Sequence, residues 1–99
     1  MAKYRVVVDK ELADIVPEYL EIRNKELSEL QALLAAGSLD EAGKIGHKLS
    51  GSGGGYGFDR LSEIGRELEA AGLAGDAASA AACAAELKDY LGNLEVVYE

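Results

Sequence analysis

The stretch Gly46–Phe58 reads GHKLSGSGGGYGF, and the rest of the chain is arranged around it. It contains His47, the only histidine among 99 residues, and the densest cluster of glycines. A glycine in a helix interior costs about 1 kcal/mol relative to alanine, so something other than helix formation must favour these residues. Two interpretations are possible. The stretch is either a loop that binds phosphate, or a helix in which glycines beside a histidine leave room for another protein to approach.

The phosphate-loop interpretation fails on spacing. A P-loop requires Lys-Ser or Lys-Thr after its last glycine, and a dinucleotide-binding loop follows a buried strand. Neither feature accompanies this stretch. The sequence therefore favours an exposed histidine on a helix.

Helical patterns flank the stretch on both sides. Pro17 suits the first turn of a helix, and Gly37 is a typical C-terminal glycine. Between them, apolar residues recur at helical spacing: Tyr19, Leu20, Leu27, Leu30, Leu33 and Leu34. Arg23 interrupts this apolar stripe. Ser38 and Glu41 then predict a capping box at the start of the histidine helix.

The histidine helix is predicted to be amphipathic. Propensity alone would end it near Ser52. Its inward face is expected to comprise Leu39, Ala42, Ile45 or Gly46, Leu49, Gly53 and Tyr56. His47 lies about 200° around the helix from Leu49, so we expect it to face outward. Its neighbours on that side are Gly43, Lys44, Ser50, Gly51 and Gly54.

Two further helices are predicted after the glycine cluster. One begins at Asp59 and closes at Gly72, with Leu61, Ile64, Leu68 and Ala71 inward. Asp76 caps the last helix, which Gly92 ends or bends, with Ala80, Ala84, Leu87, Leu91 and Leu94 inward. Short connections favour antiparallel neighbours. The predicted fold class is therefore all-α, an antiparallel up-down four-helix bundle.

The sequence predicts the secondary structure of the two ends of the chain less clearly. Asp9 is expected to cap a short additional N-terminal helix that extends to about Val16. Two β-branched runs, Tyr4–Val8 and Glu95–Tyr98, are either extended tails lying on the bundle, side by side, or the second continues the last helix. We expect a single domain over residues 1–99 with short tails at both ends.

The residues around His47 resemble the signature of the histidine-containing phosphotransfer (Hpt) domain family. After its histidine, that signature has an apolar residue at the second position, Gly at the fourth, small residues at the fifth and sixth, and Gly at the tenth. The matching residues are Leu49, Gly51, Ser52, Gly53 and Gly57. Ser50 departs from the pattern, because it stands where the family usually has Lys or Arg. The resemblance covers nearly the whole chain, and it implies that the histidine helix continues about one turn beyond Ser52.

The resemblance implies a phosphoryl carrier. His47 would accept a phosphoryl group from the phospho-aspartate of a response-regulator receiver domain, or directly from a sensor histidine kinase, and pass it to a receiver aspartate. Mg²⁺ is expected on the partner receiver. We therefore expect no metal, no cofactor and no kinase activity on this chain.

The residues that flank His47 are expected to serve the partner. Lys44 and Lys48 would stabilise the phosphoryl oxygens or steer an acidic receiver, and Ser50 would offer a hydroxyl but no charge. We expect slower transfer or a less stable phosphohistidine for that reason. Three glycines would let the receiver loops come close: Gly43, Gly51 and Gly54.

Charge and composition narrow the classes of partner. The sequence has 18 acidic and 10 basic residues, a net charge of −8, whereas nucleic acids and anionic membranes call for a basic face. No apolar stretch approaches the roughly 20 residues that span a bilayer, and the first residues, MAKYRVVVDKEL, lack the apolar segment of a signal peptide. We expect a cytoplasmic monomer that binds neither nucleic acid nor membrane.

Two other functions are compatible with the residues. One is a helical docking module that binds a receiver or kinase without accepting phosphate and would tolerate His47→Gln. The other is the phosphorylatable domain of a larger chemotaxis-type kinase. An enzyme with its own substrate is disfavoured, because the histidine has no acid–base companion within a helical turn.

Several other residues are interpreted as structural. Cys83 is expected to be a small buried apolar residue. Inward glycines are expected to permit close helix packing: Gly46, Gly53 and Gly65. Aromatic residues are expected in the core: Tyr56, Phe58 and Tyr90. Acidic helix residues are expected on the solvated surface: Glu21, Glu26 and Glu29.

Overall fold

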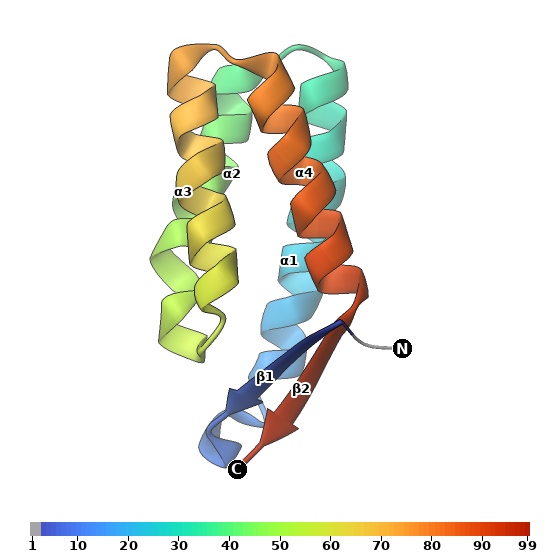
Figure 1. Cartoon of the computed structure of the whole chain (residues 1–99), viewed down its shortest axis with the longest axis vertical. Helices are drawn as coiled ribbons and strands as arrows, with labels where there is room; N and C mark the ends of the chain where they lie inside the picture. The colour runs from blue at the N-terminus through green and yellow to red at the C-terminus, as the bar shows by residue number, and fades with distance from the viewer. Residues whose placement is uncertain (1–2) are drawn as a thin grey trace.

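Four helices make up most of the molecule in the computed structural model, which describes residues 3–99 (Figure 1). The α-helices and strands of this part are β1 (Tyr4–Val8), α1 (Val16–Ala35), α2 (Leu39–Ser52), α3 (Asp59–Ala74), α4 (Ala77–Gly92) and β2 (Leu94–Tyr98). In Figure 1 the colour runs up along α1, down α2, up α3 and down α4, so consecutive helices run in opposite directions. The prediction of a mostly helical protein with four helices is confirmed.

The two ends of the chain pair as a small parallel sheet, so the fold is not purely helical. Arg5 lies opposite Glu95, and Val7 lies opposite Val97. Parallel strands require a long crossover connection, and here the four helices form that connection. Because α4 ends at Gly92 and the second strand follows, the alternative in which this run continues the last helix is wrong.

The extra N-terminal helix is reduced to a single 3-10 turn, Lys10–Leu12. Asp9 does cap it, since its Oδ1 accepts a hydrogen bond from the Glu11 amide at 2.9 Å. α1 then begins at Val16 with Pro17 in its first turn, as predicted. A helix running through Pro17 would lose a backbone hydrogen bond and clash with the preceding turn, which keeps the two segments separate.

The core lies between the helices and contains most of the residues predicted to face inward. Its largest fully buried side chains are Val16, Leu30, Leu49, Phe58, Leu61, Ile64, Leu68 and Leu87. Cys83 and Tyr90 are buried as expected, and Tyr56 is partly buried and stacks on Tyr19 with ring centroids 4.3 Å apart. Glu26 contradicts its prediction, because it is only 8% exposed rather than solvated.

Three predicted helix ends need correction. Ser38 stands at the start of α2, but its side chain makes no capping hydrogen bond. α2 ends as an α-helix at Ser52, and the additional turn, Gly54–Tyr56, is 3-10. α3 passes Gly72 and ends before Gly75, whose φ of +67° ends the helix in the left-handed conformation. Gly72 instead packs against α2, so its lack of a side chain serves a neighbouring helix and not a turn.

Candidate functional site

The site is built on a close contact between α2 and α3. A Cβ atom on Gly46 would lie 2.6 Å from the Glu69 amide nitrogen and from the Gly65 carbonyl oxygen. A Cβ atom on Gly65 would lie 2.5 Å from the Ser50 amide nitrogen. Only glycine fits such positions, so the predicted packing role of Gly46 and Gly65 is confirmed. The two helix backbones can therefore lie unusually close together.

The contact also includes Gly43, which the sequence suggested for partner access. Gly43 is buried, and a Cβ atom placed on it would lie 3.4 Å from the Gly72 Cα atom. That distance is an ordinary contact, so Gly43 lies in the helix interface although a small side chain would fit there. Gly53 packs as predicted, because a Cβ atom there would lie 2.8 Å from the Phe58 carbonyl oxygen.

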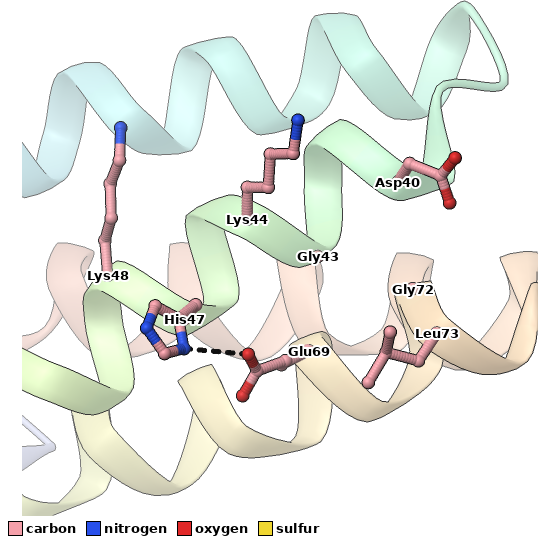
Figure 2. A pocket seen from close by; sticks show the side chains of 8 residues that line it. All are labelled: Asp40, Gly43, Lys44, His47, Lys48, Glu69, Gly72 and Leu73. Atoms are coloured by element: carbon pink, nitrogen blue, oxygen red, sulfur yellow. Dashed lines mark hydrogen bonds and ion pairs between the residues drawn. The ribbon is translucent and has the colours of Figure 1, made fainter.

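The close contact brings a carboxylate to the histidine. The His47 side chain is 76% exposed on α2, and its Nδ1 lies 2.8 Å from Oε2 of Glu69 on α3 (Figure 2). An ionised carboxylate only accepts hydrogen bonds, so Nδ1–H is the donor. In a neutral ring this leaves the lone pair on Nε2. The ring is therefore oriented through one nitrogen and keeps the other as a nucleophile.

The two lysines lie on the other side of the histidine. In Figure 2 the side chains of Lys44 and Lys48 extend from α2 toward α1, whereas the imidazole turns toward Glu69 on α3. Both lysines are exposed. A group attached to His47 would thus have a carboxylate on its α3 side and two exposed cations on its α1 side.

The remaining predicted residues differ in their surroundings. The hydroxyl of Ser50 donates to the His47 carbonyl oxygen at 3.1 Å, so it is engaged within its own helix. Gly51 is exposed, and a Cβ atom there would meet no described atom within 4 Å. Gly54 is exposed in the 3-10 turn that follows α2.

A hollow of about 620 Å³ lies beside the imidazole. Its lining is Asp40, Gly43, Lys44, His47, Lys48, Glu69, Gly72 and Leu73 (Figure 2). Leu73 is 86% exposed, the highest value among the exposed large hydrophobic side chains of residues 3–99. The hollow therefore combines an imidazole, two ammonium groups, two carboxylates and an apolar side chain.

A family model for the Hpt domain matches residues 14–96. The chain belongs to the Hpt domain family. No curated protein and no solved structure matches the chain. Hpt domains transfer phosphoryl groups through a histidine in phosphorelays of two-component signalling. They act with receiver domains and kinases and have no kinase activity of their own.

Sequence inspection of this Hpt domain missed Glu69. It lies 22 residues from His47 in the sequence and on another helix. The observation that no acidic residue lies within one helical turn of His47 therefore did not reveal it. The available signal was indirect: Glu69 follows the inward Leu68 and lies between Gly65 and Gly72, the two glycines of α3 that face α2. Glycines on one helix that lie opposite glycines on the other mark the place where the two helices come closest, and the residues beside these glycines can contact each other.

Two negative findings complete the description of this Hpt domain. Among residues 3–99, no group of three or more His, Cys, Asp or Glu side chains is arranged to hold a metal ion. Within the same residues, none of the helices has the length and apolar character required to span a bilayer.

Proposed function

We propose that this Hpt domain carries phosphoryl groups in a two-component phosphorelay and that His47 is the residue phosphorylated. The observation that carries the proposal is the exposed imidazole held through Nδ1 by Glu69. When the ring is neutral and Nδ1–H faces Glu69, the lone pair of Nε2 is free to attack a phosphoryl group. A carboxylate that accepts from Nδ1–H fixes the tautomer and the orientation of the ring.

The step that this geometry supports is an in-line displacement. Nε2 of His47 attacks the phosphorus of an aspartyl phosphate on a receiver domain, the P–O bond to the aspartate breaks, and the carboxylate leaves. The ring becomes positively charged as the Nε2–P bond forms, and the Glu69 carboxylate beside Nδ1–H stabilises that charge. Transfer to the next aspartate reverses these changes. Since the transition state is loose, the protein contributes mainly alignment and charge.

The surface around the histidine suits a receiver domain as partner. Gly51, which follows His47 by one helical turn, is exposed and has no side chain, and Leu73 offers an apolar contact in the lining of the hollow beside His47. Lys44 and Lys48 supply positive charge for the phosphoryl oxygens. The Mg²⁺ belongs to the receiver in this proposal. The carrier acts in the cytoplasm as a monomeric single domain, residues 1–99, without kinase activity.

The decisive experiment is transfer from a phosphorylated receiver domain to the wild-type protein and to its His47→Gln variant. We expect label on the wild type alone, labile in acid and stable in alkali, as a phosphoramidate is. Absence of label on both proteins, with binding to the receiver retained, would instead support the non-catalytic docking module.

A further inference from the structure

Neither lysine of α2 lies on the α3 side of the imidazole. Lys44 and Lys48 extend toward α1, whereas the ring of His47 turns toward α3 (Figure 2). Ser50, about one turn after the histidine, offers only a hydroxyl, which donates to the carbonyl oxygen of His47. A phosphoryl group carries nearly two negative charges. On the α3 side of the ring it would lie near the carboxylate of Glu69, so a cation from α3 is needed there to offset the repulsion.

The two arginines of α3 differ in their surroundings. Arg60 is engaged away from the site, because its guanidinium pairs with Glu63 on the same helix and with Glu86 on α4. Arg66 is exposed, and within the part of the chain that the structure describes its side chain forms no ion pair and no hydrogen bond. The guanidinium of Arg66 is therefore free to bind an anion.

Helix geometry places Arg66 beside the site. A Cβ atom on Gly65 would lie 2.5 Å from the Ser50 amide nitrogen, so the backbone that carries Arg66 meets α2 just where Ser50 stands. Arg66 lies about 60° around the axis of α3 from Glu69 and about 20° from Leu73. Both of these residues line the hollow. Arg66 is thus on the side of α3 that borders it.

The free nitrogen of the imidazole lies toward Arg66. Figure 2 shows Nε2 of His47 on the side of the ring away from Leu73. Because α3 runs from Arg66 through Glu69 to Leu73, Arg66 lies in that same direction, about 4.5 Å along the axis from Glu69. This separation is shorter than an extended arginine side chain. A phosphoryl group on Nε2 would therefore lie within reach of the guanidinium.

We propose that Arg66 binds the phosphoryl group on His47 and supplies from α3 the positive charge that Ser50 does not supply from α2. The inference rests on the proposed function. A guanidinium donates two parallel hydrogen bonds to phosphate oxygens, and it keeps its charge throughout. Arg66 takes part in no covalent change: the Nε2–P bond forms and the P–O bond to the receiver aspartate breaks without a proton leaving the guanidinium. Its charge offsets that of Glu69 beside the phosphoryl oxygens.

Phosphorylation of His47 by two donors tests this role. The donors are a phosphorylated receiver domain and the small molecule phosphoramidate, and the measurement is the rate at which label appears on the protein. Arg66→Gln should slow both reactions about tenfold, the loss expected when a charge-assisted hydrogen bond is removed. Arg5→Gln is the matched control, because it removes the same charge from an exposed arginine on β1. It should leave both rates unchanged.

A double variant separates the charge of Arg66 from a structural effect. Ser50→Arg combined with Arg66→Gln moves the cation from α3 to α2 and should recover most of the lost rate. No recovery, with the helical circular dichroism unchanged, would mean that Arg66 acts only on the structure of α3 and would overturn the proposal.

Two other results would also overturn it. One is equal rates for Arg66→Gln and Arg5→Gln. The other is slowing with the receiver donor alone, because Arg66 would then contact the receiver and not the phosphoryl group. If the wild-type protein accepts label from neither donor, the carrier function itself is wrong and the role of Arg66 falls with it.

Discussion

Replacing Gly46 by alanine tests whether the glycine contact between α2 and α3 holds the site together. The added Cβ would lie 2.6 Å from two backbone atoms, the Glu69 nitrogen and the Gly65 oxygen. Ordinary contacts begin at 3.4 Å, so α3 would have to move away by about 0.8 Å, the difference between the two distances. Backbone atoms cannot rotate aside, and overpacking of this kind costs about 1–3 kcal/mol.

Gly43→Ala is the matched control, because Gly43 also lies within α2. Its nearest contact would be 3.4 Å, so no shift is required. Both substitutions gain about 1 kcal/mol of intrinsic helix propensity, and this gain cancels in the comparison. We therefore expect Gly46→Ala to be less stable than Gly43→Ala by about 1–3 kcal/mol.

Urea unfolding followed by circular dichroism measures that difference, with the slope of the transition checked for constancy. The imidazole nitrogen shifts of His47 provide a second readout, since a displaced α3 should weaken the hydrogen bond between Nδ1 and Glu69. Equal stability of the two alanine variants would refute the argument that the glycine contact sets the distance between the helices.

Four further changes have expected outcomes. Glu69→Ala should slow phosphoryl transfer to the histidine about tenfold in single-turnover assays, because the imidazole loses its orienting partner; an unchanged rate would count against the mechanism. Phe58→Ala should lower the free energy of unfolding by about 3–5 kcal/mol, since Phe58 is fully buried. Leu73→Glu should weaken receiver binding about tenfold in calorimetry while leaving the unfolding free energy within about 0.5 kcal/mol of the wild type. The hydrogen bond from the Tyr4 hydroxyl lowers the pKa of Asp89 from 3.8. The ionised Asp89 therefore stabilises the folded protein above pH 3.8, and this contribution is lost as the pH falls through the lower pKa of the folded state. Asp89→Asn should make the free energy of unfolding in urea less sensitive to acid.

Local signals in the sequence were sufficient for most helix boundaries. Pro17 in the first turn of α1, Gly37 after its end and Asp76 as a cap all act through neighbouring backbone groups, and all were predicted. Two of the failures occurred at residues that are buried in the tertiary structure. Gly72 resembles a helix end but packs against Gly43, and Glu26 resembles a surface acid but pairs with the buried Arg23.

By itself, the sequence determined the four helices, the family and the outward orientation of His47, because helical periodicity and the glycine motif depend on residues close together in the chain. Only the tertiary structure decided that Glu69 meets the imidazole, that Lys48 turns toward α1, and that the two β-branched ends pair as parallel strands. These contacts join residues on different helices and strands. Which residues meet depends on where the backbone of one element can come close to the backbone of another. In this protein the glycines that face each other across α2 and α3 set that approach.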